Sequence, residues 1–222
     1  MPCCGLCHLS PGFFGTVNRL GDFHPKNPPT PSHHAKGCTL RDFSLGPWIV
    51  HDENFGVLQY ALLHVAPDVQ AVEFGVGSGT STALMARRMP VTGFDCFSGL
   101  PEDWREGFPK GSLACMPPMI RNTRLVVGLF EDTLPTFDFH TVAPLGLVHI
   151  DCDLYSSTRT ALEYVMPHAK PGCFLVFDEF HNWPGWELDG ECRAWHEYVD
   201  VHPELSWRVL GHGEQQWAIE LT

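Results

Sequence analysis

The sequence predicts an α/β fold in which a mostly parallel sheet is flanked by helices and closed by a C-terminal antiparallel hairpin. From residue 69 onward, strand-like apolar runs alternate with helix-like runs, and this alternation is typical of a parallel sheet with helices on both faces. Residues 145–150 and 173–177 are nearly continuous apolar runs, as expected of central strands that are buried on both faces. The chain ends with two strand-like runs around Gly211-His212-Gly213, which indicates the hairpin.

The individual elements can be placed in order along the chain. A helix is expected within 48–65, because Phe55, Leu58, Leu62 and Val65 recur at helical spacing. Strands are expected at 70–74, 91–95, 125–128, 145–150 and 173–177, helices at 80–89, 112–121, 155–166 and 190–200, and the hairpin strands at 207–210 and 216–221.

The chain divides into two parts. Residues 1–40 form a distinct N-terminal segment, in which the proline-rich and polar stretch 24–34 favours a disordered or lid-like conformation. Residues 41–222 carry the alternating pattern and form the predicted domain. A length of 222 residues with 44% hydrophobic content suits one domain with a full core.

Composition excludes several classes of partner. The formal charge is 14 − 26 = −12, which argues against non-specific binding to nucleic acid or to an anionic membrane. No apolar run approaches the roughly 20 residues that a membrane-spanning helix needs. The nine cysteines are odd in number and scattered, and the start of the chain lacks the pattern of a signal peptide. We therefore expect a cytoplasmic protein without a disulfide framework.

A glycine-rich turn between a strand and a helix is expected at residues 73–80, Glu-Phe-Gly-Val-Gly-Ser-Gly-Thr. Such a turn lets a ligand lie against bare backbone. Dinucleotide-binding loops read Gly-x-Gly-x-x-Gly, whereas this loop has Thr80 at the last glycine position. Glu73 would repel a pyrophosphate and is placed to hold a cationic or hydroxyl-bearing group. These features favour S-adenosylmethionine, which has an amino-acid end and no phosphate. The candidate cofactor contacts in this loop are Glu73, Gly75, Gly77, Ser78 and Gly79.

The next two strand ends carry further candidate contacts for a nucleoside. Asp95 ends the second strand 20 residues after Gly75, a spacing typical of an acid that accepts the ribose hydroxyls; its alternative role is to cap a turn. Phe130, Glu131 and Asp132 follow the third strand and are candidates to flank the adenine ring. Alternatively, Phe130 belongs to the core and the two acids begin a helix.

Carboxylates gather at the ends of the fourth and fifth strands. Asp151 ends one and Asp178 with Glu179 ends the other, 27 residues later. Adjacent strands lie about 4.8 Å apart, and two carboxylates 4 Å apart repel by about 1 kcal/mol even in water. Hard oxygen ligands select Mg²⁺ or a similar divalent cation, so these three acids are the candidate metal ligands. Asp153 either reaches the ion or caps the following helix.

The alternative to a metal site is a purely structural role for the acids, which would then cap helices or pair with Arg159 and Arg193. A metal beside a methyl donor would lower the pKa of an acceptor hydroxyl. Asp151 and His181 are the candidate general bases, whereas His149, inside an apolar strand, is expected to be a core histidine.

A tryptophan pair follows His181 in a proline- and glycine-containing loop. Trp183 and Trp186 either line an acceptor pocket or pack against the helix that follows.

Three motifs make the sequence resemble the macrocin O-methyltransferase (TylF-like) family, which consists of S-adenosylmethionine- and Mg²⁺-dependent sugar O-methyltransferases. They are Phe-Asp-Cys-Phe-Ser-Gly-Leu-Pro-Glu at 94–102, Gly-Leu-Phe-Glu-Asp-Thr-Leu-Pro at 128–135 and Ile-Asp-Cys-Asp-Leu-Tyr-Ser-Ser-Thr at 150–158. The resemblance covers about 69–221 and implies a Rossmann-like class I methyltransferase fold. It further implies donor binding at Glu73, Gly75 and Asp95, metal binding at Asp151, Asp178 and Glu179, and a homodimer. Members of the family usually carry an aspartate where this chain has Glu179.

The sequence therefore predicts an S-adenosylmethionine-dependent O-methyltransferase that uses a divalent cation. Its expected partner is a small-molecule hydroxyl acceptor, a sugar or a phenolic natural product. Two alternatives are an NAD-dependent oxidoreductase on a similar sheet and a non-catalytic module that binds S-adenosylmethionine. The sequence does not identify the acceptor.

Overall fold

The strands of the computed structural model lie where the apolar runs predict them, within the described residues 45–49, 55–141 and 143–222. The predicted segment 1–40 lies outside these residues. The strands are β1 (Gln70–Phe74), β2 (Val91–Asp95), β3 (Thr123–Val127), β4 (Leu145–Ile150), β5 (Phe174–Phe177), β6 (Trp207–His212) and β7 (Trp217–Leu221). The helices are α1 (Gly56–His64), α2 (Thr80–Ala86), α3 (Phe130–Thr133), α4 (Tyr155–Val165) and α5 (Glu191–Val201), with 3-10 turns at Leu134–Thr136, Phe139–Thr141 and Met166–His168.

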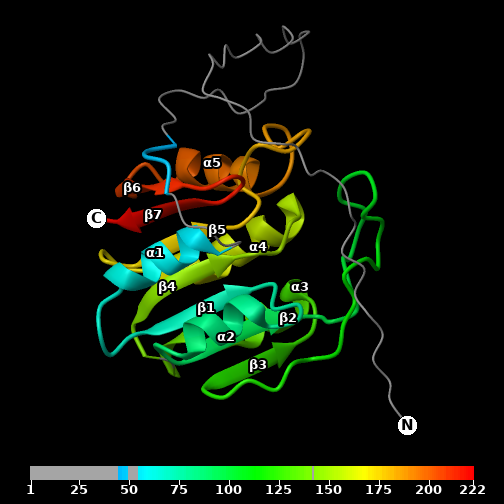
Figure 1. Cartoon of the computed structure of the whole chain (residues 1–222), viewed down its shortest axis with the longest axis horizontal. Helices are drawn as coiled ribbons and strands as arrows, with labels where there is room; N and C mark the ends of the chain where they lie inside the picture. The colour runs from blue at the N-terminus through cyan, green and yellow to red at the C-terminus, as the bar shows by residue number, and fades with distance from the viewer. Residues whose placement is uncertain (1–44, 50–54, 142) are drawn as a thin grey trace, which may run out of the picture. The chain divides into compact units, whose positions relative to one another are not determined.

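All seven strands form one sheet in the order β3-β2-β1-β4-β5-β7-β6 (Figure 1). The first five are parallel, and β7 pairs antiparallel with both β5 and β6. The predicted C-terminal hairpin is therefore confirmed. The chain runs outward from β1 to β3 and then returns to place β4 on the other side of β1. This reversal makes the carboxyl ends of β1 and β4 the topological switch point, where open α/β sheets bind their ligands.

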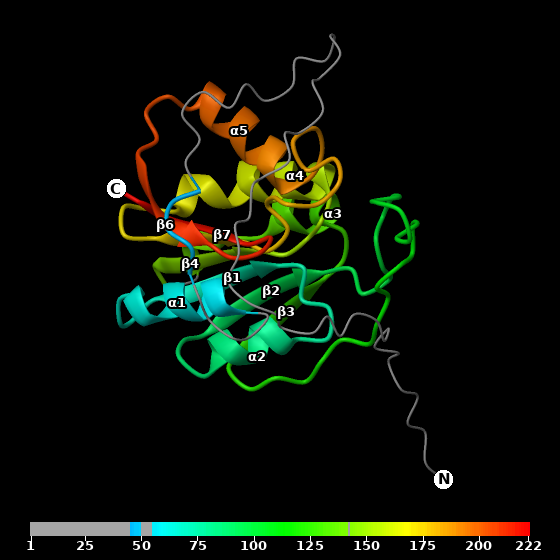
Figure 2. The same cartoon turned by 45° about the horizontal axis from the view of Figure 1, so that its top comes forward.

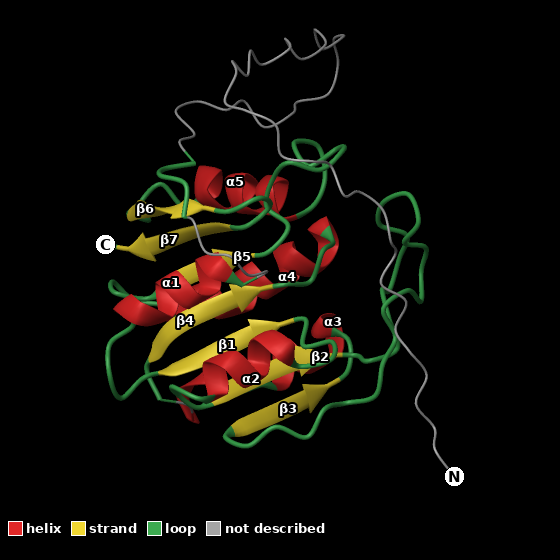
Figure 3. Ribbon diagram, viewed as in Figure 1, coloured by secondary structure: helices red, strands yellow, loops and turns green. Residues whose placement is uncertain are grey.

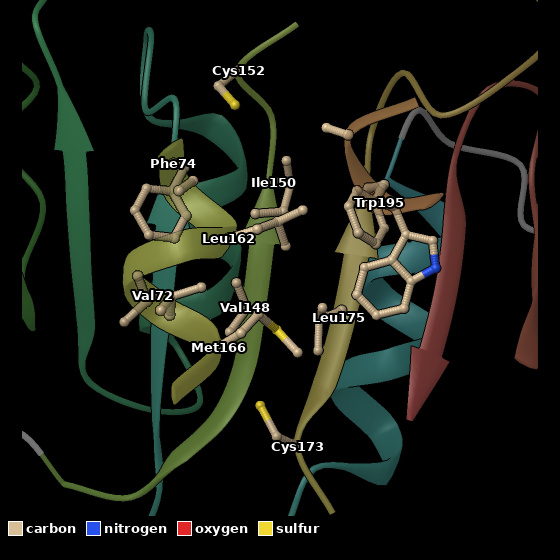
Figure 4. Packing of buried hydrophobic residues seen from close by; sticks show 14 of the residues in the cluster. Val72, Phe74, Val148, Ile150, Cys152, Leu162, Met166, Cys173, Leu175 and Trp195 are labelled. Atoms are coloured by element: carbon tan, nitrogen blue, oxygen red, sulfur yellow. The ribbon is translucent and has the colours of Figure 1, made fainter. Parts of the chain in front are cut away.

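Helices cover both faces of the sheet, as Figure 2 shows. On one face, α1 and α2 pack over alternate strand residues such as Ala71, Leu147 and Val176. On the other face, α4 and α5 pack over Val148 and Leu175, among other residues. Figure 4 shows part of this second cluster, in which Val72, Phe74, Ile150, Leu162 and Trp195 are labelled. Both faces of the central strands are thus buried, which explains their continuous apolar sequences.

The predicted helix at 112–121 is wrong. Residues 110–113 form a turn, and residues 114–120 have no regular secondary structure. The reason is the pair Pro117-Pro118, because proline lacks the N–H that a helix needs and disfavours helical geometry in the residue before it. The segment belongs instead to a long connection between β2 and β3, which Figure 3 shows as a loop on the side of the strands' carboxyl ends.

Within the described part of the chain, no helix is both long and apolar enough to cross a membrane.

Candidate functional site

The glycine loop after β1 lies at the switch point. Glycine is present at each of its three positions for a different structural reason. Gly75 has φ +89°, and a Cβ at this position would lie 1.7 Å from the backbone oxygen of Asp151. Gly75 therefore allows the ends of β1 and β4 to approach each other. Gly79 (φ +83°) precedes α2, and a Cβ there would meet Pro118 and Ile120. The β2–β3 connection thus lies over this end of the loop.

Gly77 is different, because nothing lies within 4 Å of the position its Cβ would occupy. Its φ of +50° belongs to the left-handed region. The neighbouring Ser78 is exposed, with its hydroxyl 3.2 Å from that of Thr80. Of the three glycines in this loop, Gly77 is thus the one that presents bare backbone to open space, as a bound ligand requires.

Asp95 connects the end of β2 with the glycine loop. Its Oδ2 accepts the N–H groups of Val76 and Gly77, both at 2.8 Å, and its Oδ1 accepts that of Phe97 at 2.6 Å. These bonds fix the orientation of a carboxylate that is only partly buried. Since each carboxylate oxygen can accept more than one hydrogen bond, Asp95 keeps capacity for the ribose hydroxyls proposed from its spacing.

Glu73 lies inside the protein rather than on the surface of the site. Its side chain is fully buried and accepts hydrogen bonds from the hydroxyls of Ser81 and Thr82. Its Oε1 also lies 3.0 Å from Nδ1 of His149, the residue opposite it on β4. Glu73 thus ties β1 to β4 and to the start of α2. Because its side chain has no exposed surface, direct contact of Glu73 with a ligand stays a prediction.

The end of β3 favours the structural alternative for its three candidate residues. Phe130 begins α3, packs edge-on against Phe74 at a centroid distance of 5.4 Å and joins the core. Glu131 and Asp132 occupy the first turn of α3 and are exposed. Asp132 also lines a hollow of about 410 Å³ beside Arg124 and Phe137. Contact with adenine stays a prediction for these residues.

The predicted convergence of acids is present in the structure. Asp151, Asp178 and Glu179 each offer a carboxylate oxygen, and these oxygens all lie within 4.8 Å of one another. Parallel pairing places the strand ends together, since Ile150 on β4 is opposite Phe177 on β5 and the N–H of Asp178 donates to Ile150 at 2.9 Å. We call Asp151, Asp153, Asp178 and Glu179 the acid cluster.

Burial raises the pKa of every member of the acid cluster, and repulsion within the cluster raises it further for Asp151, Asp153 and Glu179. The pKa of Asp151 lies well above its usual range because of burial and then of Asp178. Burial and Asp178 raise the pKa of Glu179 to about 10. Burial also raises the pKa of Asp178, and His149 opposes this increase. Burial raises the pKa of Asp153 to about 6, opposed first by Arg105. The charged forms of these acids are therefore costly unless a cation joins them.

The arginine alternative is not supported by any salt bridge among the described residues, although the charge of Arg105 acts on Asp153 and Glu179. No salt bridge there involves a member of the acid cluster, and Arg193 pairs instead with Glu197 at 2.8 Å. Asp153 does not cap α4 through its side chain. In addition, Oε2 of Glu179 is buried without a hydrogen-bond partner. Glu179 also shares side-chain hydrogen bonds with Asp153 and Asp178. Carboxylates at this spacing, with one unpartnered oxygen and no salt bridge, fit a hard divalent cation.

The structure does not connect His181 with the acid cluster. Its buried ring lies against His212 and Trp186, at centroid distances of 5.4 and 6.3 Å. Burial and His212 lower its pKa to about 4. No hydrogen bond or ion pair between the described residues joins His181 to these acids, so its predicted role as general base lacks a geometric basis. His149 is buried, as expected of a core histidine.

Trp183 and Trp186 mainly pack against neighbouring parts of the protein. Trp183 is only 6% exposed, donates its Nε1–H to the carbonyl of Glu179 at 2.8 Å and packs on Gly190. Trp186 packs at the border of the core.

A further aromatic group beside Trp183 comes from the β2–β3 connection, where sequence patterns gave no signal. Arg105 lies over the ring of Trp104 at 3.8 Å, and Trp104 contacts Trp183 at a centroid distance of 6.0 Å.

A buried acid on α5 was also missed by sequence reasoning. Glu191 is fully buried, and its Oε2 accepts the N–H of Glu179 at 3.2 Å. Burial, and then Glu179, raise its pKa well above the usual range. Its position at the start of a helix made a structural role the simplest interpretation, and only the fold brings it to the acid cluster.

Comparison with known proteins shows which family part of the chain is similar to. Residues 72–180 match the model of a methyltransferase domain family. The match runs from β1 through the glycine loop and the ends of β2, β3 and β4 to the residue after Glu179, and so contains every predicted donor and metal residue.

Two curated relatives and one solved structure illustrate the similarity. The first relative is 8-demethyl-8-(2,3-dimethoxy-alpha-L-rhamnosyl)-tetracenomycin-C 4'-O-methyltransferase from Streptomyces olivaceus, 32% identical over 55% of this chain and 58% of that protein. The second is mycinamicin III 3''-O-methyltransferase from Micromonospora griseorubida, 35% identical over 36% of this chain and 28% of that protein. The chain thus spans less than two thirds of either relative. The calicheamicin methyltransferase CalS11 shares the fold, with 21% identity and a TM-score of 0.59 over 74% of this chain and 76% of that one. The Rossmann-like methyltransferase fold is confirmed.

Proposed function

We propose that this protein transfers a methyl group from S-adenosylmethionine to a hydroxyl of a small natural product, in particular a sugar, with the help of a divalent cation. The observation that carries the proposal is the acid cluster. Carboxylate oxygens of three of its members, Asp151, Asp178 and Glu179, lie within 4.8 Å of one another, and no salt bridge among the described residues neutralises them. Both relatives are named as O-methyltransferases, and the name of the first specifies a rhamnosyl compound, which supports a sugar acceptor.

The donor side of the site is the glycine loop with Asp95. The open backbone at Gly77 accommodates a ligand at van der Waals distance. The Asp95 carboxylate, held by three backbone N–H groups, accepts the ribose hydroxyls. Because this orientation exists before binding, little ordering is needed when the donor arrives.

The acceptor side is the acid cluster with the neighbouring loop residues. Asp151, Asp178 and Glu179 would hold the cation. When bound, the donor supplies an electrophilic methyl group and the cation lowers the pKa of the acceptor hydroxyl. Asp153 takes the proton of that hydroxyl, since it is buried in the same cluster, two residues after Asp151, and is not used as a helix cap. Trp104 and Arg105 form one wall beside Asp153 and orient the acceptor. Positioning of this kind contributes on the order of 7–11 kcal/mol to catalysis in well-oriented systems.

Calorimetry with S-adenosylhomocysteine, with and without Mg²⁺, tests both parts of the proposal. We expect the nucleoside to bind in both conditions and Mg²⁺ to bind in a separate titration. The change Asp151→Ala should abolish Mg²⁺ binding and leave nucleoside affinity within a few-fold, because alanine keeps the backbone contact of residue 151 with Phe74. Glu163→Ala removes an exposed acid from α4 and serves as the control.

The acceptor class requires a turnover assay. Methyl transfer from labelled S-adenosylmethionine should appear in pools of glycosides and should be suppressed by EDTA. Absence of nucleoside binding in the first experiment would refute the proposed activity, whereas activity that is insensitive to EDTA and to Asp151→Ala would refute only the metal.

A further inference from the structure

Two hydrogen bonds hold the backbone of Glu179 from both sides. Its N–H donates to Oε2 of Glu191 at 3.2 Å, and its carbonyl oxygen accepts the Nε1–H of Trp183 at 2.8 Å. Both partners are buried side chains, since Glu191 is fully buried and Trp183 is only 6% exposed. The carboxylate of Glu179 itself takes no part in these bonds, and its Oε2 has no hydrogen-bond partner.

Glu179 needs such support because it lies just beyond the sheet. The pairing of β5 with β4 and with β7 ends at Phe177, and the N–H of Asp178 still donates to Ile150. Glu179 is the first residue of the following loop without such pairing. A glutamate also has one more rotatable bond than an aspartate and loses more conformational freedom when its carboxylate is fixed. A rigid backbone at this position reduces the conformational freedom that is still lost when the carboxylate of Glu179 is fixed.

The burial of Glu191 is hard to explain by packing alone. Leaving a polar group without a hydrogen bond in the interior is costly, yet Oε1 of Glu191 is buried without a partner. Among the described residues no salt bridge compensates it. The neighbours that influence it most are Glu179, Asp178 and Asp153, so it lies against the acid cluster, where an apolar residue would pack at lower cost.

We propose that Glu191 and Trp183 are positioning residues that clamp the Glu179 peptide, so that its carboxylate is presented to a divalent cation together with Asp151 and Asp178. The clamp rests on the proposed function, because it has a purpose only if these acids hold a metal. Neither residue touches the ion in this arrangement. Outer-shell partners of this kind typically change metal affinity by about 10–100-fold when removed.

Calorimetric titration of Mg²⁺ into the full-length protein, saturated with S-adenosylhomocysteine, tests the clamp. Glu191→Leu removes the acceptor and should weaken Mg²⁺ binding by about 10–100-fold. Glu191→Gln keeps a carbonyl oxygen for the N–H of Glu179 and should stay within about threefold of the wild type. Trp183→Phe keeps the ring and removes the N–H, so it should weaken binding in the same direction as Glu191→Leu. Glu187→Leu removes an exposed acid from the same loop and should have no comparable effect.

A double variant separates a shared clamp from two independent effects. Because both bonds act on one residue, Glu191→Leu with Trp183→Phe should lose less Mg²⁺ affinity than the sum of the single losses. Nucleoside affinity and the melting temperature of each variant report on folding. If Glu191→Leu fails to fold, Glu191→Gln and Trp183→Phe still decide the question.

The outcomes distinguish the clamp from the function on which it rests. If the wild-type protein binds no Mg²⁺, both the proposed metal site and the proposed clamp are refuted. A wild type that binds Mg²⁺, with Glu191→Leu and Trp183→Phe binding it equally well, would overturn the clamp alone. Equal losses in Glu191→Gln and Glu191→Leu would also overturn it, because charge rather than the hydrogen bond would then be responsible.

Discussion

At the scale of single residues, the acids around the switch point differ in whether their oxygens are occupied. Both oxygens of Glu73 accept hydrogen bonds from buried partners on β4 and α2, so this residue stabilises the site without facing it. Asp95 is occupied by backbone N–H groups but is partly exposed. Glu179 keeps an open oxygen in the interior. Hydrogen-bond occupancy therefore separates a structural acid, Glu73, from the acids that we propose to bind the donor and the cation.

Asp153 should act as the base of the reaction, and this makes a prediction about pH. In the metal-free site its pKa is raised to about 6, and a bound cation would lower this value. Because a protonated carboxyl group cannot accept a proton, we expect kcat/KM of the wild type to fall on the acid side, with a midpoint at or below about pH 6. Asp153→Asn should lower turnover by about 10²–10⁴-fold, the usual contribution of a general base, and should remove this pH dependence.

The control for Asp153→Asn is a measurement of ligand affinity rather than of turnover. Its affinities for S-adenosylhomocysteine and Mg²⁺ should stay close to the wild-type values, since the amide has the shape of the carboxylate. A variant with wild-type turnover, or with an unchanged pH profile, would exclude Asp153 as the base.

At the scale of elements, the ends of strands position the site, and this is why much of it was predictable from sequence. Buried parallel strands have recognisable apolar runs, and consecutive strands joined by a helix lie side by side. Asp151 and Asp178 could therefore be placed together from their positions after β4 and β5. The same reasoning placed Asp95 beside the glycine loop.

The features that could not be predicted depend on the orientation of side chains and on segments without regular secondary structure. Glu73 follows the apolar residues of β1, but the sequence does not say that it points toward α2 rather than the ligand. Arg105 and Trp104 lie in a connection without periodicity, so no pattern brings them to the acids. Glu191 is separated from Glu179 by a loop that contains several turns, and only the packing of α5 brings the two together.

The glycine loop gives a matched pair of variants at this scale. Gly75→Ala would place a Cβ 1.7 Å from a backbone oxygen of Asp151, and with its positive φ it should cost about 2–4 kcal/mol of stability. Gly77→Ala meets nothing within 4 Å and should cost only about 1 kcal/mol. Its methyl group, however, would occupy the open side of the loop and should weaken S-adenosylhomocysteine binding at least tenfold.

Denaturant unfolding and calorimetry on both variants separate the two effects. The expected pattern is a large stability loss in Gly75→Ala and a large affinity loss in Gly77→Ala. Wild-type affinity in Gly77→Ala would show that the donor does not approach the backbone at this position.

At the scale of the whole molecule, the fold holds buried and half-buried carboxylates together in a chain that already carries a charge of −12. Burial raises the pKa values of Asp151, Asp153, Asp178, Glu179 and Glu191, and repulsion by neighbouring acids adds to this increase. Such acids oppose folding once they ionise, because the unfolded chain ionises them at lower cost. The site is therefore a local source of instability that a bound cation would remove, and the stability of the entire domain should report on it.

The dependence of stability on pH follows from these shifts. Between the ordinary pKa of a carboxyl group, near 4, and the raised value of about 10 for Glu179, the folded state binds more protons than the unfolded state. The free energy of unfolding then decreases as pH rises. We expect the metal-free protein in EDTA to melt at a lower temperature at pH 8 than at pH 6.

Mg²⁺ should reverse this trend, because metal ligands must be deprotonated and binding is therefore stronger at high pH. At a concentration of 100 times its Kd, a ligand adds about 2.7 kcal/mol to the stability, which corresponds to a rise of roughly 5–10 °C in Tm for a protein of this size. The rise should be larger at pH 8 than at pH 6 and absent in Asp151→Ala. Scanning fluorimetry at matched ionic strength measures it, since salt alone screens surface charge. An equal rise at both pH values, or in the Asp151→Ala variant, would mean that Mg²⁺ acts elsewhere on this acidic chain and not among the buried carboxylates.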